Sequence, residues 1–156
     1  MPLVIDIPGW RRLELEHLVL DLNGTLARDG RLLPGVEPAV TRLASSLRCH
    51  LVTADTFGTA SGLLGPAVEL ARIQPGGEEA QKLEIVRRLG PERVVALGNG
   101  ANDVAMLEQA ALGIAVLGPE GTASAALAAA DLVVPGPREG LELLLKTDRL
   151  RATLRR

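Results

Sequence analysis

Short runs of apolar residues alternate with amphipathic stretches along most of this chain of 156 residues. The short apolar runs predict buried strands at 17–22, 48–53, 68–73, 93–97, 113–117 and 131–134. The amphipathic stretches carry apolar residues at helical spacing and predict helices at 36–47, 78–89, 102–110, 122–130 and 139–145. This alternation indicates an α/β fold with one doubly wound, mainly parallel sheet and helices on both faces.

The two ends of the chain depart from that pattern. Residues 1–16 alternate apolar and polar positions on both sides of a Pro-Gly pair, which predicts an antiparallel β-hairpin on the edge of the sheet. Residues 17–134 form the core of the fold, and residues 135–156 predict a C-terminal helix with a solvated basic end. The length fits one domain, so we expect residues 1–156 to form a single unit.

Composition narrows the function classes. The net charge is −2 and aromatic residues are 1% of the chain, so the broad basic surface and stacking platforms of nucleic-acid-binding proteins are missing. We expect no nucleic acid and no membrane among the partners. The single cysteine, Cys49, allows neither an intramolecular disulfide nor a cysteine-based zinc site, and the first residues do not form a signal peptide. These features favour a cytoplasmic protein.

Polar residues follow three of the predicted strands at their carboxyl ends, where doubly wound sheets bind ligands. Asp21 ends the first strand, Thr53 ends the second, and the turn Gly-Asn-Gly-Ala-Asn-Asp at 98–103 follows the fourth. Lys82, one of only two lysines among 17 basic residues, lies in the first turns of a predicted helix. A carboxylate can attack phosphorus, a hydroxyl and an ammonium suit a phosphoryl group, and an oxygen-rich turn suits Mg²⁺.

Each signal alone has a plainer explanation. Asp21 could cap a turn, Thr53 could satisfy a backbone group, and Lys82 could be a solvated helix lysine. The turn at 98–103 could be an ordinary connection between a strand and a helix. The combination of the four segments at one edge of the sheet is what favours phosphoryl chemistry.

These residues carry a resemblance to a known family. The motifs DLNGTLA at 21–27 and GNGANDVAML at 98–107, with Thr53 and Lys82 between them in the chain, resemble the four motifs of the haloacid dehalogenase superfamily. The resemblance covers about residues 17–134 and is greatest to the phosphorylation domain of P-type ATPases. It implies a Mg²⁺-dependent phosphohydrolase or phosphotransferase that acts on a phosphorylated substrate and forms an aspartyl-phosphate at Asp21.

The resemblance also implies a role for each matching residue. The catalytic group would consist of Asp21, Asn23, Thr25, Thr53 and Lys82. Substrate would contact Gly24, Thr53, Ala54, Lys82 and Asn102. The Mg²⁺ ligands would come from Asp21, the backbone carbonyl of Asn23, Asn99 and Asp103.

Two positions differ from the usual phosphatase pattern. Asn23 stands where these enzymes have an aspartate that acts as general acid and base, and Asn99 stands where they have an acidic metal ligand. We therefore expect slow turnover that favours good leaving groups, since general acid–base help is worth about 10²–10⁴ in rate. The alternative is a catalytically impaired protein of the same fold that binds phosphate or a nucleotide, or that regulates a partner.

The spacing of the motifs bears on access to the site. Asp21 and Thr53 are 32 residues apart and Thr53 and Lys82 are 29 apart, so no cap domain fits in either interval. Residues 27–33 predict only a small hairpin flap. An open site suits a large substrate or a lid from a second subunit, so a homo-oligomer remains one alternative.

Two other fold assignments match the sequence less well. A dinucleotide-binding turn needs a third glycine that the segment 98–103 lacks. A phospho-receiver domain has its phosphate acceptor in the middle of the chain and does not begin with a DxxGT motif.

Overall fold

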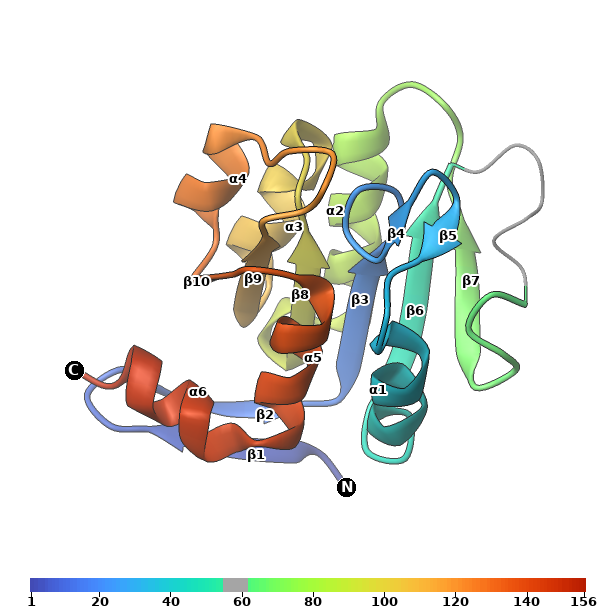
Figure 1. The fold of residues 1–156 in the computed structure, drawn as a ribbon. Coiled ribbons are helices and arrows are strands. Elements are labelled where there is room, and N and C mark those ends of the chain that lie inside the picture. The colour runs from blue at the N-terminus through green and yellow to red at the C-terminus, as the bar shows by residue number, and fades with distance from the viewer. Residues whose placement is uncertain (55–61) are drawn as a thin grey trace.

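The computed structural model describes residues 1–54 and 62–156 and contains a six-stranded parallel sheet in the order β10-β9-β8-β3-β6-β7 (Figure 1). Its strands are β3 (His17–Asp21), β6 (Arg48–Thr53), β7 (Val68–Arg72), β8 (Val94–Gly98), β9 (Leu112–Val116) and β10 (Leu132–Val134). Every adjacent pair of these strands runs parallel. The predicted doubly wound α/β fold is therefore confirmed.

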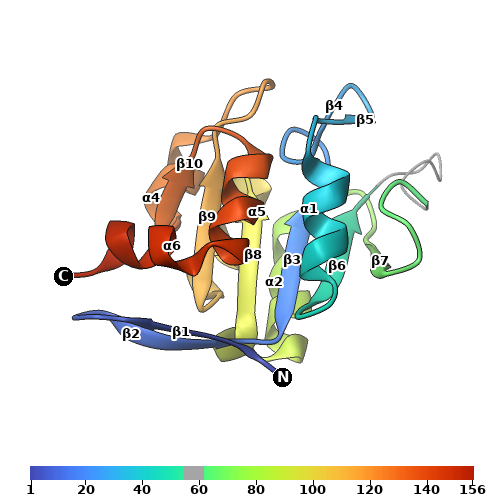
Figure 2. The ribbon, with the colours of Figure 1, turned by 60° about the horizontal axis from the view of Figure 1, so that its bottom comes forward.

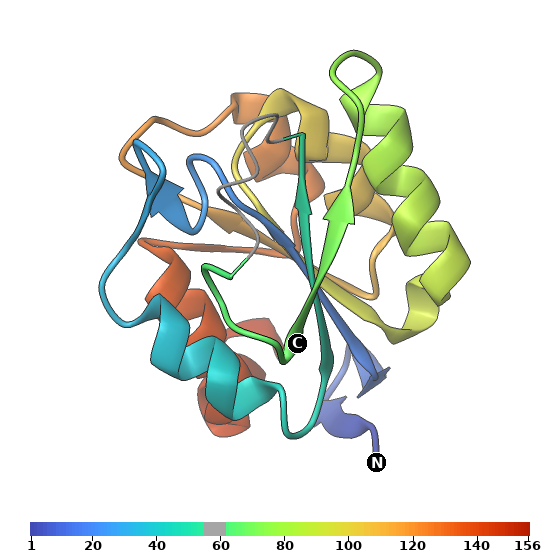
Figure 3. The ribbon, with the colours of Figure 1, turned by 90° about the vertical axis from the view of Figure 1, so that its right-hand side faces the viewer.

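Helices cover both faces of this sheet (Figure 3). One face packs against α1 (Val36–Leu43) and α5 (Pro137–Leu145), and the other packs against α2 (Glu78–Leu89), α3 (Val104–Gln109) and α4 (Ser124–Ala129). The central strand β3 supplies both layers, because Leu18 and Leu20 enter the first core while Val19 enters the second. Within the described residues, no helix is long and apolar enough to cross a membrane.

The order of the strands places a crevice at the carboxyl end of β3. The chain passes from β3 to β6 on one side and later returns to β8 on the other, so the direction of winding reverses at β3. Loops leaving adjacent strands on either side of such a point separate and leave room for a ligand. The strand ends at Asp21, Thr53 and Gly98 therefore border one space.

A small flap rises beside this crevice. The strands β4 (Ala27–Arg28) and β5 (Arg31–Leu32) form an antiparallel hairpin, as expected for residues 27–33. Asp29 and Gly30 form its turn with φ values of 50° and 77°, a pair of left-handed residues that matches the twist of a two-residue hairpin.

The N-terminal hairpin forms, but its predicted place on the sheet edge is wrong. Strands β1 (Leu3–Ile7) and β2 (Arg11–Leu15) make a separate two-stranded sheet at the end of the molecule opposite the crevice (Figure 2). Its apolar face, with Ile5 and Leu13 among the buried residues, joins the larger core. At this place the hairpin covers the open end of the core and removes its own apolar face from water, which favours folding.

The C-terminal segment is two helices, so the expectation of one helix over 135–156 is wrong. The backbone of Lys146 has φ −127° and ψ 70°, which separates α5 from α6 (Thr147–Leu154). Leu150 of α6 is fully buried in the core that includes the N-terminal hairpin. Arg151 donates to the backbone oxygen of Asp6, and the backbone N–H of Arg156 donates to Pro8. The basic end is thus bound to the hairpin.

We expect Leu150→Ala to lower the free energy of unfolding by about 2–5 kcal/mol, because it leaves a cavity between α6 and the hairpin. Thr153→Ala, an exposed change in the same helix, should alter it by about 0.5 kcal/mol or less. Chemical unfolding of the three proteins measures this. Equal losses in both variants would contradict the proposed contribution of α6 to the core.

Candidate active site

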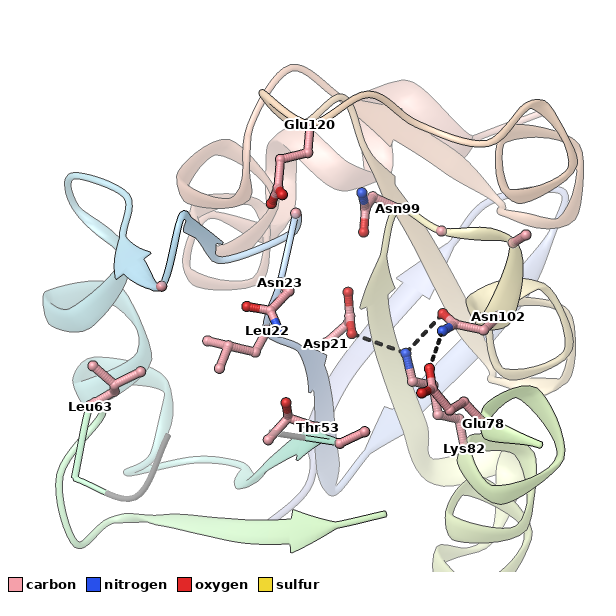
Figure 4. A pocket seen from close by; sticks show the side chains of 15 residues that line it. Asp21, Leu22, Asn23, Thr53, Leu63, Glu78, Lys82, Asn99, Asn102 and Glu120 are labelled. Atoms are coloured by element: carbon pink, nitrogen blue, oxygen red, sulfur yellow. Dashed lines mark hydrogen bonds and ion pairs between the residues drawn. The ribbon is translucent and has the colours of Figure 1, made fainter. Parts of the chain in front are cut away.

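A pocket of about 810 Å³ opens at the carboxyl end of β3 (Figure 4). The candidate residues on its wall come from all four sequence segments and comprise Asp21, Asn23, Gly24, Thr53, Ala54, Lys82, Asn99 and Asn102. Thr25 and Asp103 lie behind the wall and are almost completely buried. The structure thus brings together every residue that the motifs single out.

The loop after β3 holds the Asp21 carboxylate from one side. The Thr25 hydroxyl lies 2.9 Å from Asp21 Oδ2 and 2.9 Å from Asn99 Oδ1. Its one proton can be donated to either of these two oxygens. Gly24 makes the required turn with φ 78°, and an added Cβ there would lie 2.6 Å from Asn99 Nδ2. The DxxGT spacing therefore has a local cause, since Gly allows the turn and Thr returns to the carboxylate.

Lys82 holds the same carboxylate from the other side. Its ammonium group donates to Asp21 Oδ1 at 3.0 Å, to Asp103 Oδ1 at 2.8 Å and to Asn102 Oδ1 at 3.0 Å. These contacts use all three of its donors. Burial alone would lower the pKa of Lys82, but the negative charges of Asp21 and Asp103 outweigh it and raise that pKa. Lys82 is therefore a buried cation with two anionic partners.

Asp103 anchors the turn that follows β8. Its Oδ2 accepts the backbone N–H groups of Asn99 at 3.0 Å and Gly100 at 2.9 Å, while its Oδ1 accepts from Lys82. A Cβ at Gly98 would lie 2.6 Å from the Asp103 carboxyl carbon, so the turn closes tightly over this side chain. Both Asp103 oxygens are engaged, although the resemblance implies a metal ligand at this position.

Burial changes the acidity of the central carboxyl group. Removal from water, followed by the charge of Asp103, raises the pKa of Asp21 to about 6 from an ordinary value of 3.8. The charge of Lys82 and the hydrogen bonds from Lys82 and Thr25 act in the opposite direction. The carboxyl is thus ionised at neutral pH but accepts a proton readily in mild acid.

Two oxygen donors suited to a hard cation lie side by side at the pocket. The Asp21 carboxylate and the Asn99 amide oxygen are both within 2.9 Å of the Thr25 hydroxyl. Asn99 Nδ2 donates to the backbone oxygen of Gly121 at 3.0 Å, which fixes the amide with its oxygen toward Asp21. Among the described residues, no three His, Cys, Asp or Glu side chains cluster as a metal site. The donor set fits Mg²⁺ that keeps several waters.

Sequence reasoning missed three residues on the pocket wall. Leu63 and Glu120 come from loops, and Glu78 opens α2 and accepts from Asn102 Nδ2 at 2.6 Å. Glu120 belongs to a turn at 118–122, which follows β9 at the same edge of the sheet. Position after a parallel strand was the signal that could have identified it.

Similarity to known proteins agrees with this geometry. Residues 77–136 match the family model of haloacid dehalogenase-like hydrolases, and this stretch contains Lys82 and the turn at 98–103. A phospholipid-transporting ATPase of Caenorhabditis elegans, tat-1, is 41% identical over 90 residues, which are 58% of this chain and 6% of the ATPase. The chain thus resembles the haloacid dehalogenase superfamily, as the motifs predicted. Its likeness to P-type ATPases is confirmed as well.

One further relative and one solved structure are also similar to this chain. An uncharacterized protein of Methanocaldococcus jannaschii is 39% identical over 92 residues, covering 56% of this chain and 99% of that protein. The fold is similar to 3-deoxy-D-manno-octulosonate 8-phosphate phosphatase from Moraxella catarrhalis, solved with magnesium, phosphate and KDO, with a TM-score of 0.67. That match has 18% identity and covers 90% of this chain and 94% of the phosphatase. This compact fold has no inserted cap domain among the described residues.

The raised pKa of Asp21 makes a prediction for the metal-free protein. The carboxyl signal that Asp21→Asn removes from a ¹³C NMR spectrum should titrate near pH 6. The folded state keeps this proton where the unfolded chain has lost it, so the group favours folding below about pH 4 and loses that contribution as the pH rises through about 6. Unfolding from pH 4 to 7 should show Asp21→Asn gaining stability relative to wild type. A constant difference would contradict the shift.

Proposed function

We propose that this protein is a Mg²⁺-dependent phosphohydrolase that forms an aspartyl-phosphate on Asp21. The observation that carries the proposal is the Asp21 carboxylate at the floor of an open pocket, held by Lys82 on one oxygen and by Thr25 on the other. A carboxylate held in this way is oriented toward a ligand and ionised at neutral pH. The family likeness supports the same reaction class.

In the first step, a carboxylate oxygen of Asp21 attacks the phosphorus of a bound ester. The new oxygen–phosphorus bond forms as the bond to the leaving oxygen breaks, and the leaving group takes its proton from water. Water then attacks the aspartyl-phosphate, which releases inorganic phosphate and restores the Asp21 carboxylate. Lys82 supplies positive charge to the carboxylate and the phosphoryl oxygens, and the Thr53 hydroxyl lines the same pocket as a phosphoryl-oxygen ligand.

Mg²⁺, when bound, would neutralise charge on the transferred phosphoryl group. We assign its protein ligands to the Asp21 carboxylate, the Asn23 backbone carbonyl and the Asn99 amide oxygen. We assign Asp103 a different role from the one the resemblance implies, because both of its oxygens are used by Lys82 and the turn. Asp103 would position Lys82 and Asn99, and Asp21 would be the one charged protein ligand.

The two asparagines limit the rate. Asn23 is exposed at the pocket wall, but its amide cannot act as a general acid near neutral pH. It therefore cannot protonate an alkoxide leaving group. Asn99 offers an uncharged oxygen, which weakens Mg²⁺ binding relative to a carboxylate. We infer slow turnover that favours aryl and acyl phosphates.

The second candidate is a phosphate- or nucleotide-binding regulatory protein on the same fold. The observation that favours it is the Asn99 side chain, whose amide is tied between Thr25 and the backbone of Gly121. A metal ion there would have to replace part of this contact. The same assay decides between the two candidates.

We expect purified protein with Mg²⁺ to hydrolyse an aryl phosphate, and Asp21→Asn to lower that rate by about 10³-fold or more, since it removes the nucleophile. Phosphate release measures the rate, and acid-quenched protein should carry one acid-stable, hydroxylamine-labile phosphate in the wild type alone. Asp148→Asn, an exposed change far from the pocket, serves as control. Equal background rates in wild type and Asp21→Asn would favour the binding protein instead.

The missing general acid gives a gain-of-function prediction. Asn23→Asp places a titratable carboxyl on the pocket wall and should raise kcat on alkyl phosphates by about 10-fold or more. The gain on aryl phosphates should be smaller, because their leaving groups need less protonation. Steady-state kinetics on one substrate of each kind tests this. A uniform change on both would show that position 23 does not serve the leaving group.

A further inference from the structure

The charges around the pocket point to a class of substrate. We propose that, within the proposed function, this pocket selects phosphate esters whose leaving group is neutral or cationic and rejects leaving groups that carry a carboxylate or a second phosphate. Glu120 and Glu78 are the residues that would set this selection. Lys82 would not counteract it, because its donors are already used by other side chains.

Lys82 has no free N–H donor for an anion on the leaving group. Its three donors are committed to Asp21, Asn102 and Asp103, and its side chain is 4% exposed. No other lysine or arginine lines the pocket among the residues that the structure describes. The segment 55–61, which lies outside the described residues, contains no basic residue in its sequence. A leaving-group anion would therefore find no cation of this chain in the pocket.

The pocket wall instead presents two further carboxylates. Figure 4 shows Glu120 above Asn23 and Asn99, while Glu78 lies beside Asn102 on another side of the pocket. In the described part of the chain, neither glutamate forms a salt bridge. Glu78 accepts only from the neutral Asn102 amide. Both charges are thus available to repel an anion or attract a cation.

The arginines of the flap do not line the pocket. Arg28 and Arg31 lie on the hairpin and border a separate surface hollow with Leu33, whereas the flap contributes only Gly30 to the pocket wall. The apolar part of the wall comes from Leu22 and Leu63. A leaving group that combines an apolar body with a hydroxyl or an amine would match these surroundings.

Phosphate itself would still be accepted, because the charge of Lys82, the Thr53 hydroxyl and the proposed Mg²⁺ would act on it at the floor of the pocket. The carboxylates at the rim act on the part of the substrate that projects from the floor. Since carboxylates near a pocket lower the association and binding of anions, discrimination of about 10-fold or more is expected. It should weaken at high salt, because Glu120 is exposed.

Three phenyl phosphates with a hydroxymethyl, aminomethyl or carboxymethyl group at the meta position test the selection. The methylene spacer keeps the acidity of the three phenols similar, so kcat/KM reports mainly the charge. We expect the neutral and cationic esters to exceed the carboxymethyl ester by about 10-fold or more in kcat/KM. Equal values for all three in wild type would overturn the proposal.

Variants assign the effect to residues. The pair Glu78→Gln and Glu120→Gln should bring the ratio between the neutral and anionic esters toward one, with Glu120→Gln alone giving part of that change. Glu84→Gln, on the exposed side of the same helix as Glu78 and outside the pocket, is the matched control and should leave the ratio unchanged. Selection that persists in the double variant would overturn the roles of these glutamates.

A binding measurement separates this proposal from the proposed function. The matching meta-substituted benzylphosphonates cannot be hydrolysed, and calorimetry with Mg²⁺ gives their Kd for the wild type and the double variant. Charge-selective binding without turnover would overturn the phosphatase and support the selection. Turnover with equal Kd values would overturn the selection alone, and the absence of both binding and turnover would overturn both.

Discussion

The ion pairs of one buried ammonium group hold the candidate site together. Lys82 reaches from α2 between Asp21 at the end of β3 and Asp103 in the turn after β8, so one side chain links three elements that are distant in sequence. A buried charge is stable only when it is paired and hydrogen-bonded, and removal of one partner leaves the others uncompensated. Each of the three groups therefore constrains the other two, and the pocket floor has one charge arrangement.

That arrangement orients Asp21 and also limits which other groups the site can bind. The same contacts that fix Asp21 as an oriented carboxylate also use every donor of Lys82 and both oxygens of Asp103. Little charge remains for a metal ion or for a second anionic group on a ligand. Under the proposed function, affinity for phosphate would come from the charge of Lys82, the Thr53 hydroxyl and Mg²⁺.

Much of the fold follows from the sequence because the signals are periodic and local. Strand β6 and helix α2 have the predicted bounds, since each is a clean apolar run or an amphipathic repeat between turn residues. The hairpin β1–β2 was also readable, but its location was not, because apolar alternation does not say which open surface a hairpin covers. The break at Lys146 was missed since the segment keeps helical composition on both sides.

The candidate site, like the fold, could be predicted from the sequence only in part. Motif spacing indicated Asp21, Thr25 and Lys82. Asp21 ends β3, Thr25 lies in the loop that follows, and Lys82 comes from α2, which meets them at the carboxyl edge of the sheet. The spacing did not indicate Glu120, an exposed charge in a loop of ordinary composition, nor that both oxygens of Asp103 are used by Lys82 and the turn after β8. Both depend on side-chain directions that only the packed structure determines. The motifs thus indicated the candidate residues, and the hydrogen bonds of the structure show which partners each of them contacts.

The place of the N-terminal hairpin has a practical meaning. The hairpin and α6 form the base of the molecule, both chain ends lie at that base, and the pocket opens at the opposite end of the sheet (Figures 1 and 2). A partner domain, tag or solid support attached through either end would leave the pocket facing solution. The two chain ends and the candidate active site thus lie at opposite ends of the molecule.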